Sequence, residues 1–284
     1  MNEPMFIALA ALLGLVLGSF LNVVIHRLPR MMERQWAQDV SDWLAQQEAK
    51  PEDPAEPIEP YSLLRPRSHC SSCAKPLAWA DNVPVLSYLA LRGRCRYCAA
   101  PIGRRYPLVE LATAALFAAC AWRWGASPAA LAWAAFAAVL LALACIDADT
   151  QLLPDDLTLP LAWAGLIVAA LGWTAVSLSQ AVWGAVAGYL LLWLVHHGFK
   201  WVTGRQGMGQ GDFKLLAALG AWLGWPALLP VVLLASGAGA AVGIGLRLSG
   251  RLQAGEPLPF GPYLVSAGLM LMFAPNHGAD WFWR

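Results

Sequence analysis

Long apolar runs separated by short polar breaks make up most of this chain. The first run, Phe6–Ile25, has 20 residues and can cross a hydrocarbon core of about 30 Å as a helix. Seven more candidate spans follow a polar stretch: Pro107–Trp124, Ala129–Ile146, Leu157–Val176, Ala181–Phe199, Phe213–Trp225, Ala227–Leu246 and Phe260–Pro275. The pattern predicts an all-α polytopic membrane protein with about eight transmembrane helices. The sixth and seventh spans are the least defined, because only a tight turn at 224–226 separates them.

The composition excludes an ordinary soluble domain. Of the 284 residues, 58% are hydrophobic and 13% are charged, whereas charged residues make up about a quarter of a typical globular domain. The charge is also concentrated, since 12 of the 19 Lys and Arg residues lie between His26 and Arg105. We therefore divide the chain into a first transmembrane helix at 1–25, a polar insertion at 26–106 and a seven-helix membrane core at 107–284.

The basic residues predict the orientation of the spans. If both termini lie outside, the cytoplasmic loops are 26–106, 147–156, 200–212 and 247–259. These loops and their flanks hold 17 of the 19 Lys and Arg residues, as the positive-inside rule requires. The polar insertion is therefore expected in the cytoplasm. Membrane lipid is an expected partner, and nucleic acid is not.

The first part of the insertion, Glu33–Pro60, predicts a short helix and then a flexible spacer. Trp36, Val40, Trp43 and Leu44 would lie on one side of that helix. The following KPEDPAEPIEP run is too rich in proline and acidic residues for a packed core. We expect a solvated spacer with an interfacial helix.

The second part of the insertion contains two CxxC pairs, Cys70/Cys73 and Cys95/Cys98. The 21 residues between the pairs are close to the spacing of four-cysteine zinc sites. The cytoplasm keeps thiols reduced, which favours a metal over disulfides. Four thiolates fill a tetrahedron and leave no position for water, so we expect the zinc to be structural.

Two carboxylates from distant segments are predicted to lie at the same cytoplasmic edge of the membrane. Asp147 ends the third span, where an acid opposes the negative end of the helix macrodipole and needs another reason to be there. Asp212 opens the sixth span within GMGQGDFK, whose glycines leave room for an extended chain. Close together, the two carboxylates would share one proton, as in an aspartic protease. The neighbouring Asp149, Asp155 and Asp156 are explained by a solvated loop and by capping of the next helix.

Taken together, these motifs resemble the type IV prepilin peptidases, a family of integral membrane aspartic proteases. GxGD is the sequence around one catalytic Asp in intramembrane aspartyl proteases. The resemblance covers nearly all of the chain except 33–60. The matching segments are Gly18–Pro29, the two CxxC pairs, Asp81–Tyr97, Tyr106–Leu111, Asp147 within IDADTQLLPD, and the GxGD run.

The resemblance implies an enzyme with two activities. Asp147 and Asp212 would be the catalytic pair that removes the basic leader from type IV prepilins and type II secretion pseudopilins. Cleavage would take place at the cytoplasmic face of the bacterial inner membrane. Many members then methylate the new N-terminal residue with S-adenosylmethionine, an activity linked to the four-cysteine insertion. The chain has no glycine-rich dinucleotide-type fingerprint, so no residue is assigned to the methyl donor.

Five further residues in the matching segments have two interpretations each. Gly93 and Glu110 are candidates for functional positions, or else a turn glycine and a helix-end acid. Gly18, Ser19 and Asn22 lie in the first span, where small and polar residues serve helix packing and hydrogen bonding more often than substrate contact.

Three alternative functions are weaker. A presenilin-like protease without methyltransferase activity would cut within the bilayer, but both acids here are predicted at its edge. A proton-coupled transporter would need acids nearer the midplane and a repeated half, and the sequence shows no internal repeat. A zinc-ribbon scaffold on a membrane anchor leaves the paired acids unexplained.

Overall fold

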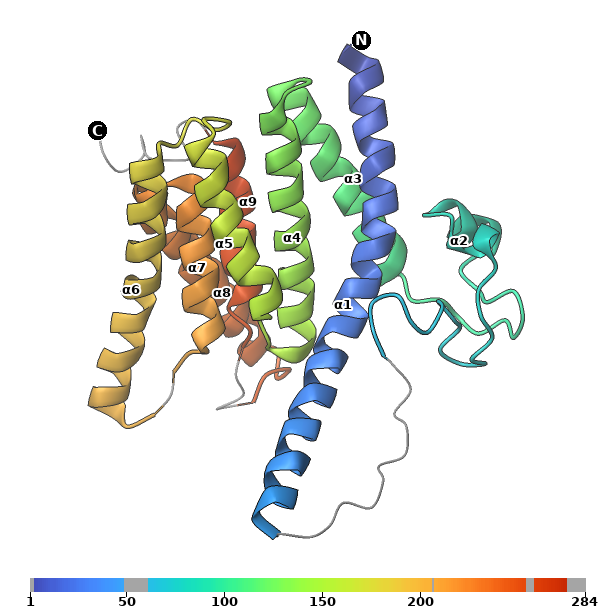
Figure 1. The fold of residues 1–284 in the computed structure, drawn as a ribbon, viewed down its shortest axis with the longest axis horizontal. Helices are drawn as coiled ribbons and strands as arrows, with labels where there is room; N and C mark the ends of the chain where they lie inside the picture. Colours follow the sequence, from blue (N-terminus) through green and yellow to red (C-terminus); the bar gives the residue numbers. More distant parts are fainter. Residues whose placement is uncertain (1–2, 49–60, 206, 254–257, 275–284) are drawn as a thin grey trace. The chain divides into compact units, whose positions relative to one another are not determined.

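The computed structural model describes residues 3–48, 61–205, 207–253 and 258–274, and these residues are helical without a β-strand. The all-α prediction is therefore confirmed (Figure 1). Eight longer helices occur at the eight predicted runs: α1 (Glu3–Glu48), α3 (Arg105–Trp124), α4 (Pro128–Thr150), α5 (Asp155–Ala170), α6 (Leu178–Thr203), α7 (Gln210–Leu223), α8 (Leu228–Leu248) and α9 (Gly261–Phe273). Three short elements complete the set: η1 (Trp79–Asn82), α2 (Leu86–Ala90) and η2 (Trp225–Ala227).

Within the described ranges, four helical segments are long and apolar enough to cross a membrane. They are Glu3–Gln47, Pro128–Thr150, Leu178–Thr203 and Trp225–Leu248, the last of which joins η2 to α8. The α9 helix is apolar but shorter. For α3, α5, α7 and α9, the expectation that each helix crosses the bilayer stays a prediction.

The α1 helix continues well past the predicted end of the first span. It runs unbroken for 46 residues, with Pro29 inside it. The apolar run ends at Ile25, but the residues beyond Pro29 are mostly Met, Arg, Gln, Glu, Ala and Leu, which favour a helix. The helix predicted at the start of Glu33–Pro60 is therefore present, but as the end of α1 and not as a separate short helix. Residues 49–60, which include most of the expected spacer, lie outside the described residues. A hydropathy pattern marks where a membrane span ends, which here is not where the helix ends.

The chain divides into two compact units, Met1–Trp122 and Arg123–Arg284. In the first unit, α3 packs directly on α1, so the boundary falls beyond the expected division after residue 106. A Cβ on Gly14 would lie 2.7 Å from the Cα of Ala114, and a Cβ on Gly18 would lie 2.7 Å from the Cα of Glu110. The side-chain amide of Asn22 donates to the carbonyl of Tyr106 at 3.0 Å. The packing and hydrogen-bonding interpretation of the first span is thus confirmed at these positions.

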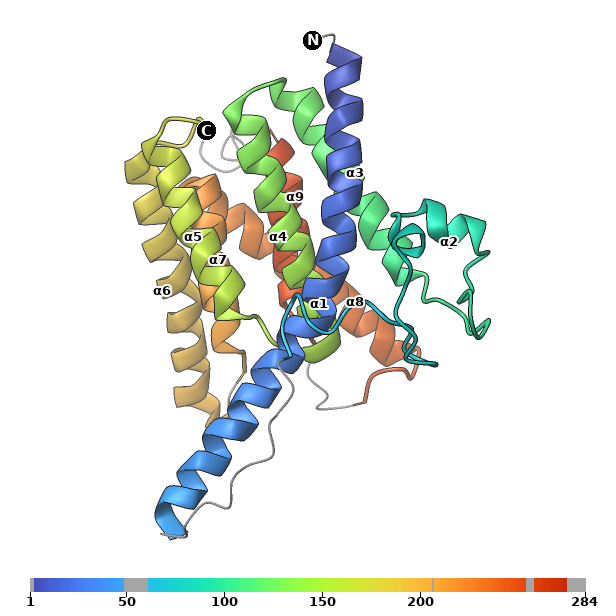
Figure 2. The same ribbon diagram turned by 45° about the vertical axis from the view of Figure 1, so that its right-hand side comes forward.

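The second unit is built around α7. Helices α5 and α6 lie beside it in both ribbon views (Figures 1 and 2), and ten of its residues are buried. The close approach to α6 depends on glycine, since a Cβ on Gly188 would stand 2.6 Å from the carbonyl oxygen of Leu216. The α9 helix packs against α4, α7 and α8.

An aromatic cluster fixes the direction of α4 relative to α7. Trp133, near the start of α4, meets Trp222, near the end of α7, with ring centroids 5.3 Å apart. Phe136 stacks on the same Trp222 at 4.7 Å. The two helices therefore run in opposite directions, and the end of α4 shares one end of the unit with the start of α7. Asp147 and Asp212 lie on those two helix ends.

Candidate active site

The side chain of Asp147 lies where two helix ends meet. Its backbone belongs to the last turn of α4, and its side chain is buried, with 4% exposed. The carboxylate Oδ2 accepts a 2.9 Å hydrogen bond from the backbone N–H of Gly261, the first residue of α9. An anion is stabilised at a helix N-terminus. The start of α9 thus supplies the favourable environment that the end of α4 does not.

Gly261 is a residue that the sequence interpretation missed. A Cβ at this position would lie 2.6 Å from Oδ2 of Asp147 and 3.0 Å from its Cγ. The carboxylate can therefore reach the amide only because residue 261 has no side chain. The available signal was the Gly–Pro pair at the start of the last span, since Pro is common in the first turn of a helix.

Asp212 lies in the first turn of α7, two residues after the helix begins at Gln210. Its carboxylate accepts a hydrogen bond from the backbone N–H of Gly209, the N-cap residue. This is the reciprocal half of a capping box, in which the third helical residue reaches back to the cap. The side chain is buried, with 7% exposed. Both predicted acids are thus held by a backbone amide at a helix start.

The two carboxylates lie in the same unit and interact with each other. The negative charge of Asp147 acts on the carboxylate of Asp212. Two buried carboxylates whose charges repel each other resist being ionised at the same time. Such a pair therefore keeps one proton between its two members. One such pair can both accept and donate a proton during a reaction.

The three glycines of the GMGQGD run have different surroundings. A Cβ on Gly207 would meet the ring of Phe199 at 2.8 Å, and one on Gly211 would meet Cβ of Leu153 at 2.7 Å. A Cβ on Gly209 would approach only Oδ2 of Asp212, at 3.9 Å. Gly209 is exposed and has an extended backbone, with φ −74° and ψ 150°. Two glycines thus allow internal packing, and Gly209 leaves open space beside the carboxylate of Asp212.

The other acids of this region are exposed. Asp149 lies in the last turn of α4, and Asp155 and Asp156 lie in the first turn of α5, so none of the three is in the loop itself. Asp155 receives both of its hydrogen bonds from Nζ of Lys214, at 2.7 Å each. The N-cap of α5 is Pro154 and no side chain caps the helix, so the expected N-cap role of Asp155 or Asp156 is wrong. Both acids nevertheless lie in the first turn, where a negative charge is favourable. The ion pair instead ties the start of α5 to the first turn of α7.

The two CxxC turns of the first unit have the same backbone geometry. The amide of Ala74 donates to the carbonyl of Cys70 at 2.9 Å, and that of Ala99 donates to the carbonyl of Cys95 at 3.0 Å. Both alanines have φ 56°. A left-handed conformation costs a residue with a Cβ about 1 kcal/mol. Its occurrence at matching positions indicates two equivalent turns that each direct a pair of sulfurs the same way.

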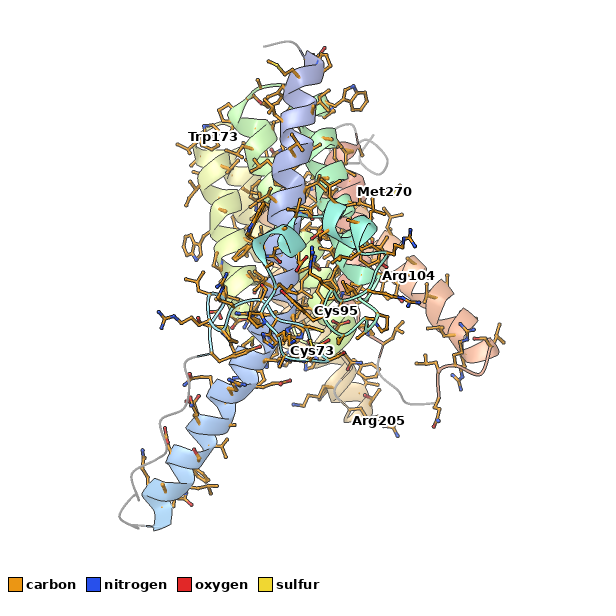
Figure 3. The ribbon with its side chains drawn as sticks, turned by 90° about the vertical axis from the view of Figure 1, so that its right-hand side faces the viewer. Cys73, Cys95, Arg104, Trp173, Arg205 and Met270 are labelled. Atoms are coloured by element: carbon orange, nitrogen blue, oxygen red, sulfur yellow. The ribbon has the colours of Figure 1, made fainter. Side chains whose placement is uncertain are left out.

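The four sulfurs of these turns fit one tetrahedral metal ion. All lie within 4.8 Å of one another, and Cys73 and Cys95 approach each other in Figure 3. The Sγ atoms of Cys70 and Cys98 are 3.8 Å apart, close to the ~3.8 Å edge of a tetrahedron with Zn–S bonds of about 2.3 Å. Backbone amides of Cys73 and Ser72 lower the pKa of the Cys70 thiol to about 6, whereas desolvation and the neighbouring sulfurs raise the pKa of the Cys98 thiol to about 11. Cys70 is therefore the more readily ionised of these two thiols. The predicted four-cysteine cluster is therefore assembled.

Gly93 and Glu110 occupy structural positions in the first unit. Gly93 has φ +69°, and a Cβ there would lie 3.0 Å from the ring of Tyr88. Glu110 is buried, and its carboxylate accepts hydrogen bonds from the backbone N–H of Val85 at 2.8 Å and from the hydroxyl of Ser19. The turn-glycine interpretation is confirmed for Gly93. Glu110 links α3 to α1 and to the start of α2.

Comparison with protein families gives two matches that together span most of the chain. Residues 12–124 match the bacterial peptidase A24 N-terminal domain. Residues 134–244 match the type IV leader peptidase family.

Curated relatives cover nearly the whole chain. A prepilin leader peptidase/N-methyltransferase of Burkholderia pseudomallei (strain 1026b) is 54% identical over 269 residues, which is 95% of this chain and 85% of the relative. Proteins of the same name from Aeromonas hydrophila and Pseudomonas aeruginosa are each 50% identical. They align over 98% and 93% of this chain and over 94% and 88% of their own lengths. No solved structure matches the chain.

Proposed function

Because the chain belongs to the type IV leader peptidase family, we propose that it cleaves the leader from prepilins and pseudopilins and then N-methylates the new N-terminus. The relatives are named prepilin leader peptidase/N-methyltransferase, so their name includes both activities. The peptidase reaction is assigned to Asp147 and Asp212 in the second unit. N-methylation uses S-adenosylmethionine and is assigned to the first unit, with structural zinc on Cys70, Cys73, Cys95 and Cys98.

The observation that carries the peptidase proposal is the shared arrangement of the two acids. Asp147 is held by the amide of Gly261 and Asp212 by the amide of Gly209, and both side chains are buried. The ionised carboxylate takes a proton from water as the oxygen attacks the scissile carbonyl. The protonated carboxyl gives its proton to the carbonyl oxygen. In the breakdown of the tetrahedral intermediate, the first carboxyl gives the proton it took from water to the leaving nitrogen, and the second carboxylate takes a proton back from a hydroxyl of the intermediate. The C–N bond then breaks and the neutral amine leaves.

The proposed substrate fits the open side of this pair. A prepilin has a basic leader followed by an apolar helix, so its cleavage site rests at the cytoplasmic membrane surface. The proposed topology, with both termini outside, puts Asp147 and Asp212 at that depth. Gly209 provides extended backbone and free space beside Asp212, and the exposed Asp149 and Asp156 attract the basic leader electrostatically.

The zinc cluster supports a structural metal in the methyltransferase unit. Four cysteine sulfurs complete a tetrahedron, which leaves no coordination position for water or substrate. Zinc would therefore hold the two CxxC turns together and take no part in methyl transfer. The presenilin-like alternative does not account for this cluster, and the transporter alternative does not account for two acids that both lie at helix ends.

Substitution of each acid by its neutral isostere tests the peptidase proposal. In proteoliposomes with a prepilin substrate, Asp147→Asn and Asp212→Asn should each lower the cleavage rate on the order of 10⁴-fold, as for members of a catalytic unit. Asp42→Asn, a change at an exposed acid of α1 to which no role is assigned, should stay within about threefold of wild type. Cleavage at the wild-type rate by either buried-acid variant would refute the assignment.

The same variants separate the two activities. With a substrate whose leader has already been removed, both Asn variants should transfer a labelled methyl group at the wild-type rate, because neither residue belongs to the first unit. Wild-type enzyme that cleaves prepilin but adds no label would limit the protein to a peptidase.

A further inference from the structure

The first unit contains a large cavity that none of the assigned residues explains. Its volume is about 1270 Å³, and its walls come from α1, the segment 61–72, η1, α2 and the start of α3. Small-molecule sites usually occupy about 300–1,000 Å³. The space is therefore sufficient for a ligand as large as a nucleoside with a side chain. Cys70 and Cys95 also line it, so the zinc-bound segment forms part of the wall.

Asp81 gives this cavity a built polar site. It lies in η1, and its side chain is 2% exposed. Oδ1 accepts hydrogen bonds from Nε of Arg96 at 2.8 Å and from Nη2 at 2.6 Å. Oδ2 is buried and has no hydrogen-bond partner among the residues that the structure describes. A buried acceptor is normally satisfied, which indicates that Oδ2 is reserved for a donor on a ligand.

Glu110, the second acid lining the cavity, differs from Asp81 in this respect. Its carboxylate is already engaged by the amide of Val85 and by the hydroxyl of Ser19. Glu110 therefore shapes the wall, whereas Asp81 offers an acceptor. The ligand expected at Asp81 carries an N–H or O–H group.

Basic residues around the cavity are of two kinds. Arg27 is buried and fixed by the carbonyl oxygens of Ser62 and Leu63, at 3.0 and 3.3 Å. The other lining arginines are exposed, namely Arg30, Arg34, Arg65, Arg67 and Arg96. Arg96 is already paired with Asp81, and Arg34 lies over the ring of Tyr61 at 4.0 Å. The exposed guanidinium groups suit a carboxylate, with which arginine forms bidentate hydrogen bonds. The cavity thus fits a ligand that bears both hydrogen-bond donors and an anionic group.

We propose that this cavity binds the methyl donor, S-adenosylmethionine, with Oδ2 of Asp81 accepting from its hydroxyl or ammonium groups. The inference rests on the N-methyltransferase part of the proposed function. The donor carries a ribose, whose hydroxyls are commonly bound by an acidic residue, and its carboxylate is the partner for the exposed arginines. Its adenine can stack on an aromatic ring, and Tyr61, Tyr88 and Tyr106 line the cavity.

Binding measurements on the full-length enzyme in lipid nanodiscs test this proposal. Asp81→Asn keeps the Oδ1 acceptor for Arg96 and replaces Oδ2 by an NH₂ group. It should weaken equilibrium binding of labelled S-adenosylmethionine at least about tenfold, while zinc content and prepilin cleavage stay at wild-type levels. Asp39→Asn removes an exposed acid of α1 that does not line the cavity and should bind the donor as wild type does.

A second variant distinguishes ligand binding from a structural role. Arg96→Gln breaks the same ion pair but leaves both oxygens of Asp81 able to accept. If Asp81 only anchors Arg96, the two variants will weaken donor binding equally, and the proposal is overturned. The proposal expects the larger loss in Asp81→Asn.

The remaining outcomes are also decisive. Wild-type affinity in Asp81→Asn would overturn the cavity assignment and leave the proposed function intact. No donor binding by wild-type enzyme that still cleaves prepilin would refute the methyltransferase proposal instead. Displacement of bound donor by inorganic phosphate or by phosphatidylglycerol, with no effect of Asp81→Asn, would identify an anion or lipid site in place of the donor site.

Discussion

The two units build their candidate sites in different ways. In the first unit, the four sulfurs come from two short turns with the same backbone, so each turn supplies a finished pair of ligands. In the second unit, the two acids come from the end of α4 and the start of α7, and each is held by an amide at a helix start. The metal site is therefore local to its sequence, whereas the acid pair depends on the packing of α4, α7 and α9. The metal site should therefore tolerate substitutions in the packing of distant helices, whereas the acid pair should not.

Loss of the metal should abolish methyl transfer, which is assigned to the first unit, and should change prepilin cleavage by the second unit only slightly. Cys70→Ser/Cys73→Ser removes half of the ligands, so stoichiometric zinc should be lost together with methyl transfer, because a structural zinc site contributes directly to folding. Prepilin cleavage should fall less than about tenfold. Metal analysis and the two activity assays on one preparation check this.

A matched change provides the control for that experiment. Cys120→Ser alters a buried cysteine of α3 outside the cluster and should retain zinc. Stoichiometric zinc in the Cys70/Cys73 variant would contradict the four-cysteine site.

Gly261→Ala should test the non-local support of the acid pair. The new Cβ would stand 2.6 Å from Oδ2 of Asp147, so the carboxylate must move. A misplacement of about 1 Å at a reacting group can cost on the order of 10²-fold in rate. Cleavage should drop by about that factor, while zinc and methyl transfer are unchanged.

Gly268→Ala is the matched control in the same helix. Its Cβ would lie 2.6 Å from Cδ2 of Leu219, an equally close contact with an apolar side chain. It should affect stability more than catalysis. Equal losses of cleavage in the two alanine variants would show that crowding of α9, and not the position of Asp147, limits the rate.

The smallest effect is expected from the ion pair between Lys214 and Asp155. Their side chains are 28% and 52% exposed, and such pairs contribute about 0.2–1 kcal/mol. Lys214→Met and Asp155→Asn should each lower cleavage about two- to fivefold, by loosening the first turn of α7. The double variant should be no worse than either single variant, since the two changes remove one interaction. Fully multiplicative losses would indicate that the two residues act separately.

Sequence patterns predicted the parts of this molecule that depend on local chemistry. The eight longer helices occur at the predicted apolar runs, because each run carries its own helical and hydrophobic signal. The cysteine cluster was also predictable, since CxxC spacing directs two sulfurs at one ion. Asp147 and Asp212 were predicted at the same membrane face from the distribution of Lys and Arg alone. The structure places them at the same end of the second unit, and their position in the membrane stays a prediction.

Features that depend on contacts between distant segments were not predictable in the same way. Asp147 was recognised as out of place at a helix C-terminus, but its partner amide on Gly261 lies on another helix. That Oδ2 of Asp81 lacks a partner among the described residues could be recognised only from the structure, in which Arg96 donates both of its hydrogen bonds to Oδ1. The end of α1 was also missed, because hydropathy reports lipid contact and a helix can continue into water.

The most direct test of the account is whether the two acids act as one catalytic unit. Cleavage rates of Asp147→Asn, Asp212→Asn and the double variant should be measured in the same proteoliposomes. Because members of a catalytic unit are strongly non-additive, the double variant should be as slow as the slower single variant. Measurable cleavage by either single variant, with a further multiplicative loss in the double variant, would contradict the shared-proton pair.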